Sequence, residues 1–182
     1  MAHEPSPSGV HRSPGSYQLY IMRHGLAAAG GTPEYPEDAK RPLTAEGKKK
    51  MQEISKGLKR LGVAVDWIVS SPLVRAVETA EIVAPALLSE GQVEHSETLS
   101  PGGSPEALVA HLAKHPQRRR VLVVGHEPDL SGLAARLIGA GRHVSLAFKK
   151  GGCCLIKFEE FPPRSPGQLA WWLSPRVMRK LA

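Results

Sequence analysis

The chain has 182 residues, of which 41% are hydrophobic, so it is long enough to bury the core of one domain. Its formal net charge of +7 favours an acidic or phosphorylated partner, because excess positive charge concentrates anions near a protein surface. Aromatic residues make up only 5% of the chain and do not alternate with arginine clusters, which argues against nucleic acid as the partner.

Membrane and secretory segments are not expected in this sequence. No apolar run approaches the roughly 20 residues that cross a bilayer, and the first residues lack the apolar stretch of a secretory signal. We therefore expect no membrane association and a cytoplasmic location. The two cysteines, Cys153 and Cys154, are adjacent, so they cannot join distant segments or supply spaced metal ligands. We expect both to be reduced core residues.

Residues 1–16 are rich in Pro, Ser, Gly and His and carry almost no large apolar side chains. Such a composition cannot offset the entropy of ordering, so we expect a disordered leader followed by a single domain at 17–182. Three short apolar runs rich in β-branched or aromatic residues then predict buried strands, at residues 18–22, 65–70 and 121–125.

Helical patterns separate these strands. Residues 44–61 place apolar side chains three and four apart with lysines on the opposite face, and Thr44 suits the cap position better than a substrate contact. Ser71 before Pro72 predicts a second helix, capped by Ser71, that continues to about residue 88. The same Ser-Pro signal predicts a third helix over 106–114, and a fourth is expected over 128–138.

The alternation of strands and helices predicts an α/β fold. We expect a three-layer sandwich with a mainly parallel central sheet of about six strands and helices on both faces. Residues 153–158 and 168–173 predict a terminal hairpin, because the proline-rich connection between them is too short for a crossover helix. In such a sheet, ligands gather at the carboxyl ends of the strands.

Basic side chains follow three of the predicted strands, at this carboxyl edge. Arg23 and His24 come after the first strand, Arg75 after the second, and His126 after the third. Two arginines and two histidines at one edge suit a phosphoryl dianion, because guanidinium groups match its oxygens and helix N-termini add amide donors. The sequence therefore predicts a phosphate site.

His24 is the candidate nucleophile of that site. A neutral imidazole can attack phosphorus in line, and covalent transfer divides one difficult displacement into two easier ones. Gly25 should let the chain turn sharply and leave its amide close to the ligand. With Arg23, Arg75 and His126 to neutralise the oxygens, we expect neither a metal nor another cofactor.

Four motifs in a fixed order carry a resemblance to a known family. They are LYIMRHG at 19–25, RPLTAEG at 41–47, SSPLVRAVETA at 70–80 and VVGHEP at 123–128. Together they resemble the signature of the histidine phosphatase superfamily, from about residue 17 to the C-terminus. The short length, RPLT and the segment WLSPR at 172–176 are most similar to the SixA-type phosphohistidine phosphatases.

The resemblance implies a phosphoglycerate mutase-like fold and a role for each matching residue. His24 would accept the phosphoryl group, and Arg23, Arg75 and His126 would bind its oxygens. Arg41 would be an auxiliary phosphate contact, although its neighbourhood also reads as ordinary loop charge. Many members of the superfamily use a carboxylate as proton donor.

The nearest carboxylates for that role are Glu97 and, second, Glu127. The sequence after Glu97 lacks the acidic, glycine-rich continuation of the mutase and phosphomonoesterase branches, so Glu97 reads equally well as a proton donor or as a solvated edge carboxylate.

Four functions remain open at this stage. The leading one is hydrolysis of phosphohistidine on a protein, such as a histidine phosphotransfer domain, through phosphorylated His24. The second is hydrolysis of small phosphomonoesters or sugar phosphates by the same nucleophile. The third is phosphoryl binding without turnover, which would not need an in-line nucleophile. The fourth, a basic nucleic-acid binder, lacks the aromatic residues noted above.

Overall fold

The fold is built on one mixed sheet of six strands. A computed structural model describes residues 16–89, 93–141 and 144–182, so the expected leader lies, apart from Ser16, outside the described residues. The strand order is β3-β2-β4-β1-β5-β6. The strands are β1 (Tyr17–Arg23), β2 (Trp67–Ser70), β3 (Val93–His95), β4 (Arg120–Gly125), β5 (Cys153–Phe158) and β6 (Gln168–Leu173).

Strand directions match the expected α/β fold class. The strands β3, β2, β4 and β1 pair in parallel, whereas β5 pairs antiparallel with both β1 and β6. The hairpin expected at 153–158 and 168–173 is confirmed with the same bounds. The sheet is therefore parallel on one side of β1 and antiparallel on the other.

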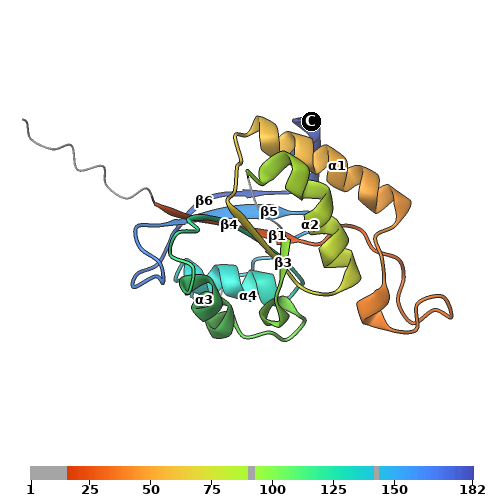
Figure 1. The fold of residues 1–182 in the computed structure, drawn as a ribbon, viewed down its shortest axis with the longest axis horizontal. Coiled ribbons are helices and arrows are strands. Elements are labelled where there is room, and N and C mark those ends of the chain that lie inside the picture. Colours follow the sequence, from red (N-terminus) through yellow and green to blue (C-terminus); the bar gives the residue numbers. More distant parts are fainter. Residues whose placement is uncertain (1–15, 90–92, 142–143) are drawn as a thin grey trace, which may run out of the picture.

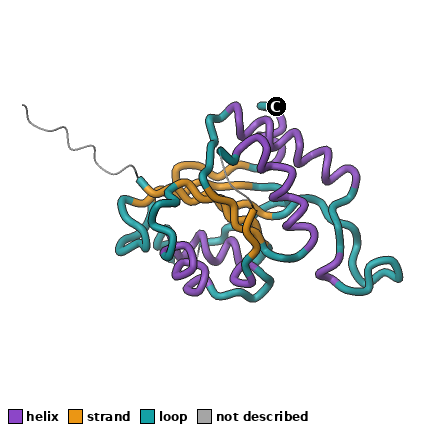
Figure 2. The backbone as a smooth tube through the Cα atoms, in the orientation of Figure 1, coloured by secondary structure: helices purple, strands orange, loops and turns teal. Residues whose placement is uncertain are grey.

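Helices cover both faces of the sheet and make three layers (Figures 1 and 2). One face carries α1 (Ala45–Arg60), α2 (Val74–Leu87) and the short α5 (Pro175–Lys180). The other face carries α3 (Pro105–Ala113) and α4 (Asp129–Leu137). Two short 3-10 turns, η1 (Asp38–Lys40) and η2 (Glu97–Leu99), lie in the connections. No helix in the described ranges is long and apolar enough to cross a membrane.

The core consists of two apolar layers, one on each face of the sheet. Along β1, Tyr20 and Met22 join the layer under α1 and α2, whereas Leu19 and Ile21 join the layer under α3 and α4. This alternation follows from the two-residue period of a strand. Cys153 and Cys154 are both fully buried in opposite layers with free thiols, as expected of core cysteines.

Two of the three expected helix caps are confirmed. The Thr44 hydroxyl accepts the amide of Gly47 at the start of α1, and the Ser104 hydroxyl accepts the amide of Ala107 at the start of α3. The expected cap at Ser71 is wrong, because α2 begins at Val74. The amide of Ser71 still pairs with the Val124 carbonyl of β4 at 2.9 Å, so the chain turns into the helix only afterwards.

The elements that the sequence did not indicate are short. They are β3, η1 and η2, of three residues each, and α5, whose six residues make less than two helical turns. Helix α5 packs closely on α1: a Cβ at Gly57 would lie 1.9 Å from the carbonyl oxygen of Met178. A glycine is therefore required at this contact.

Candidate active site

Two histidines lie side by side at the carboxyl edge of the parallel strands. His24 follows β1 and His126 follows β4, and the amide of His24 donates to the Gly125 carbonyl at 3.1 Å. Their ring centroids are 5.1 Å apart, and the residues are only 6% and 3% exposed. The register of β1 and β4, which pairs Arg23 with Gly125, thus sets the distance between the two rings.

Two arginines lie on elements that end or begin at the same edge. Arg23 is the last residue of β1, and its Nη1 donates to the Phe148 carbonyl at 2.7 Å. Arg75 is 4% exposed in the first turn of α2 and donates through Nη1 to the Asp38 carbonyl at 2.7 Å. Its Nη2 donates to Oδ2 of Asp38 at 2.9 Å.

Three buried nitrogens of this group have no hydrogen-bond partner among the described residues. They are Nε of Arg23, Nε of Arg75 and Nδ1 of His126. Buried donors without a partner cost free energy, so a cluster of them at one strand edge indicates a place for an acceptor. An anion with several oxygens suits two guanidinium groups and an imidazole.

The ring of His24 is held in the tautomer that a nucleophile needs. Its Nδ1 lies 2.7 Å from the Gly25 carbonyl oxygen, which can only accept a hydrogen bond, so Nδ1 carries the proton. The neutral ring therefore keeps its lone pair on Nε2. Burial, together with the nearby charges of His126, Arg75 and Arg23, lowers the pKa of His24 from 6.5 to about 3 despite the Gly25 bond. The nucleophile is thus neutral at pH 7.

His126 has a partner that we did not expect. Its Nε2 lies 2.8 Å from the hydroxyl of Ser71, which also accepts the amide of Leu73 at 3.3 Å. If the Ser71 hydroxyl donates its proton to Nε2, the single proton of the neutral His126 ring lies on Nδ1. Nδ1 can then donate this proton to an anion. Burial first, and then the charge of Arg75, lowers the pKa of His126 from 6.5 to about 4.

Gly25 differs in part from its expected use. Its amide donates to the Thr79 hydroxyl at 3.0 Å, and that hydroxyl donates to the Arg75 carbonyl at 2.7 Å, so the amide is not free for a ligand. A Cβ at Gly25 would lie 2.8 Å from Cγ of Met51, so the glycine allows close packing. Thr79 thereby joins the end of β1 to α2, the helix that carries Arg75. The sequence indicated Thr79 only through its place in the motif at 70–80.

Arg41 lies beside the site, with every guanidinium nitrogen already bonded. Nε and Nη2 donate to Oδ1 of Asp38, at 2.9 and 2.5 Å, and Nη1 donates to the Ala28 carbonyl at 2.8 Å. Asp38 therefore joins Arg41 to Arg75. Burial opposes ionisation of this carboxyl, but hydrogen bonds from Arg41 and Arg75 lower the pKa of Asp38. In the sequence, only the spacing of three residues between Asp38 and Arg41 indicated this ion pair.

In the described part of the chain, the carboxyl groups of the two candidate proton donors form no hydrogen bond or ion pair with Arg23, His24, Arg75 or His126. Glu97 is exposed in η2, and its Oε2 accepts the Ser100 hydroxyl at 2.6 Å. Glu127 accepts the Ser131 hydroxyl at 2.6 Å through Oε2 and the Phe148 amide at 2.7 Å through Oε1. Because the Phe148 carbonyl accepts Arg23, Glu127 supports Arg23 through this backbone.

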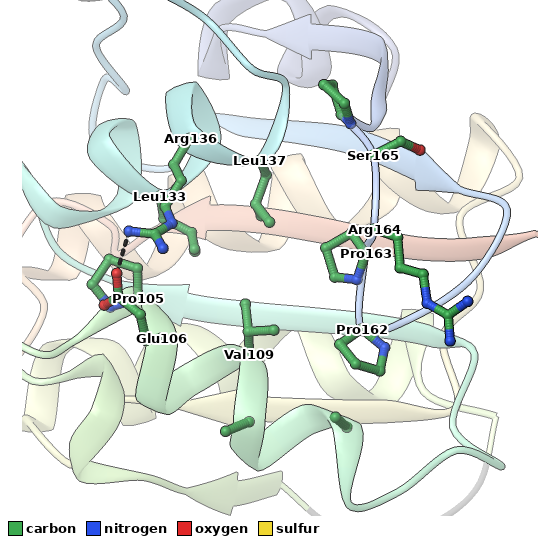
Figure 3. Close-up of a pocket in the computed structure, with 13 residues that line it drawn as sticks. Pro105, Glu106, Val109, Leu133, Arg136, Leu137, Pro162, Pro163, Arg164 and Ser165 are labelled. Carbon is green, nitrogen blue, oxygen red and sulfur yellow. Dashed lines mark hydrogen bonds and ion pairs between the residues drawn. The ribbon is translucent and has the colours of Figure 1, made fainter.

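A large hollow lies away from these residues. A groove of about 560 Å³ runs between α3, α4 and the loop at 162–166, and it does not include His24, His126, Arg23 or Arg75 (Figure 3). Its floor is apolar, with Val109, Leu133 and Leu137. Across the described ranges, no three His, Cys, Asp or Glu residues cluster so that they could hold a metal ion.

Comparison with known proteins places these residues in a family. The model of the histidine phosphatase superfamily (branch 1) matches residues 19–100. An uncharacterized protein of Picosynechococcus sp. is 39% identical over 140 residues, which are 74% of this chain and 81% of that protein. Phosphohistidine phosphatase SixA of Escherichia coli is 32% identical over 122 residues, which are 66% of this chain and 73% of SixA.

Solved structures agree with this placement. The structure of the protein histidine phosphatase SixA complexed with tungstate has a TM-score of 0.76 and 28% identity, and the alignment covers 88% of this chain and 99% of that one. A mycobacterial glucosyl-3-phosphoglycerate phosphatase shares the fold at 17% identity, with a TM-score of 0.67 over 88% of this chain and all of that one.

Proposed function

Because the chain belongs to the histidine phosphatase superfamily and is therefore a phosphatase, we propose that it removes the phosphoryl group from phosphohistidine on a protein. The observation that carries the proposal is a neutral His24 held beside three buried nitrogens without a partner, on Arg23, Arg75 and His126. The likeness to proteins named phosphohistidine phosphatase supports this substrate class.

In the first step, Nε2 of His24 attacks phosphorus of the substrate phosphohistidine. The new bond joins Nε2 to phosphorus, the bond from phosphorus to the substrate nitrogen breaks, and its electron pair stays on the substrate imidazole. Arg23, Arg75 and His126 bind the three outer oxygens, whose charge shifts in the transition state. The Gly25 carbonyl stabilises the positive charge that develops on the His24 ring, because Nδ1 donates to it.

In the second step, water attacks phosphorus of phosphorylated His24 and inorganic phosphate leaves. The bond between Nε2 and phosphorus breaks, its electron pair returns to His24, and the proton lost by water goes to solvent. The low pKa of His24 means that the ring ends neutral, ready for another cycle. Two guanidinium groups balance the phosphoryl charge in both steps, so we propose that no metal is needed.

The leaving group decides between phosphohistidine and alkyl phosphates. An alkoxide leaves as the conjugate base of an acid about as weak as water, so its departure requires a positioned proton donor. The imidazole of phosphohistidine has a conjugate acid with a pKa of about 6.5, so it leaves with a proton from solvent near neutral pH. Glu97 and Glu127 are bonded to other groups, and phosphohistidine is the substrate that tolerates this.

The partner that fits this chemistry is a phosphorylated protein, and a histidine phosphotransfer domain is our specific proposal for it. We propose that the two act in the cytoplasm, where the buried thiols of Cys153 and Cys154 stay reduced. The alternative is a phosphatase of small phosphomonoesters or sugar phosphates, and the fold shared with the mycobacterial sugar-phosphate enzyme favours testing it.

The deciding experiment compares kcat/KM for a phosphohistidine protein with values for p-nitrophenyl phosphate and a panel of sugar phosphates. We expect the phosphohistidine protein to be preferred over the sugar phosphates by more than a hundredfold, because a missing general acid costs about 10²- to 10⁴-fold on alkyl esters. The p-nitrophenyl ester, whose leaving group departs without a proton donor, reports the turnover of the nucleophile alone. A sugar phosphate with the higher kcat/KM would favour the alternative.

Variants test the nucleophile and the donor separately. His24→Gln should abolish turnover and the acid-labile phosphoenzyme, whereas the exposed His95 can be replaced with Ala as a matched control. Undiminished activity in His24→Gln would exclude covalent catalysis. Glu97→Gln should cost little on phosphohistidine, and a loss above about a hundredfold would show that a general acid is required after all.

A further inference from the structure

A second hollow includes the residue that follows the nucleophile in the chain. It has a volume of about 210 Å³ and opens between α1, α5 and the loop at 148–152. Met51 and Ile54 of α1 make its apolar floor. Its wall includes Gly25, the residue that follows His24 in the chain.

Four basic side chains line this hollow: Lys50, Lys150, Arg176 and Arg179. Lys50 pairs with Glu46 and Arg179 pairs with Glu53, each at 2.5 Å. Lys150 and Arg176 are exposed, and neither has a carboxylate partner within 4.0 Å among the described residues. Two positive charges of the hollow are thus left for an incoming anion.

The loop that carries Lys150 is fixed to the nucleophile. The amide of Gly151 donates to the carbonyl oxygens of Arg23 and His24, at 3.1 and 3.0 Å. Gly151 has a φ of 78°, and a Cβ there would lie 2.9 Å from Cδ1 of Ile54, so the loop packs tightly on the apolar floor. Lys150 is therefore held at the rim next to His24.

We infer that this hollow binds acidic side chains that flank the phosphohistidine on the partner protein, an inference that rests on the proposed function. Two free cations match one or two carboxylates, and the apolar floor suits the methylene groups of a glutamate. On a helix, residues three and four positions from the phosphohistidine lie about 5–6 Å away, within reach of a hollow that begins at Gly25. The charge pairs would give partner selection as well as faster association.

Two synthetic helical peptides test this inference. Each carries one phosphohistidine; one has glutamates three and four residues away, and the other has glutamines at those positions. We expect the wild-type protein to hydrolyse the acidic peptide with a kcat/KM about tenfold higher, as two exposed ion pairs allow. Added salt should reduce the preference, because exposed charges are screened.

Charge reversal locates the preference on the protein. The double variant Lys150→Glu and Arg176→Glu should prefer the neutral peptide. The control reverses Lys114, the C-cap of α3, and Lys157 of β5, which lie outside the hollow, and should keep the wild-type ratio. Urea unfolding of each variant checks that the fold is retained.

The outcomes separate the two claims. Equal turnover of both peptides by the wild type, or an unchanged ratio in the double variant, overturns the inference and leaves the proposed function standing. No turnover of either peptide overturns the proposed function and the inference with it.

Discussion

Acid should destabilise the folded protein through His24. The pKa of this ring is about 3 in the folded protein and 6.5 in an unfolded chain. Between these values the unfolded state binds a proton that the folded state does not, so stability falls as the pH drops below about 6.5. Above that pH neither state binds the proton, and the contribution to stability is constant.

The size of the effect follows from the two pKa values. Lowering the pH from 6.5 to 4.5 should cost about 2 kcal/mol of unfolding free energy through His24 alone. His24→Gln removes this titration and leaves the other groups in place. Urea unfolding of both proteins at the two pH values should therefore show a loss about 2 kcal/mol larger in the wild type. Equal losses would refute the inference that burial keeps the ring neutral.

A direct measurement complements the unfolding data. Two-bond proton–nitrogen correlation spectra report which ring nitrogen of a histidine carries the proton. At pH 5, His24 should be about 99% neutral, whereas a histidine with a pKa of 6.5 would be only about 3% neutral. The spectra should show the proton on Nδ1, as the bond to the Gly25 carbonyl requires. A proton on Nε2 would contradict the proposed attack by that nitrogen.

Three further predictions test other parts of the molecule. Asp38→Asn should tighten binding of inorganic phosphate up to about fivefold in calorimetry. The mostly exposed Asp38 carboxylate competes with phosphate for Arg75, and such an ion pair is worth about 1 kcal/mol; an unchanged Kd would contradict this. Gly57→Ala should lower the free energy of unfolding by about 1–3 kcal/mol in urea, because its Cβ would meet the Met178 carbonyl. Gly132→Ala is the control: its Cβ would have no atom within 4 Å, so it should stabilise α4 by up to about 1 kcal/mol. A chelator should leave turnover of phosphohistidine unchanged; loss of activity that zinc or magnesium restores would show that the arginines do not suffice.

Periodicity and strand ends were enough to predict most of the fold. The buried runs at 18–22 and 121–125 lie within β1 and β4, and the resulting register brings His24 next to His126. The short elements β3 and α5 were not found, because β3 (Val93–His95) contains a single apolar residue and α5 has less than two helical turns. The cap expected at Ser71 failed because local sequence does not show that the strand pairing with Val124 continues one residue further.

The partners of the candidate site residues depended on contacts between distant segments. Asp38 meets Arg75 across 37 residues, and Thr79 meets Gly25 across 54. The phosphate contact expected of Arg41 stays a prediction; in the structure its guanidinium bonds Asp38, three residues earlier. A sequence motif indicates which side chains gather at a strand end. Which of their hydrogen-bond donors remain without a partner depends on contacts that form only in the folded protein.

The contacts around the site keep its positive charge available for a phosphoryl group. Arg23 and His24 donate to backbone carbonyls, of Phe148 and Gly25, so these bonds fix the side chains without adding a negative charge. Arg75 alone of the four residues bonds a carboxylate in the described structure, and that carboxylate, Asp38, has a side chain 60% exposed on a surface loop. A phosphoryl dianion would bind the unpartnered Nε of Arg75 and compete with the Asp38 carboxylate for Nη2. Because the Asp38 carboxylate is mostly exposed and is hydrated again once released, the dianion should displace it from Arg75, and Asp38 would bind Arg75 again when phosphate leaves.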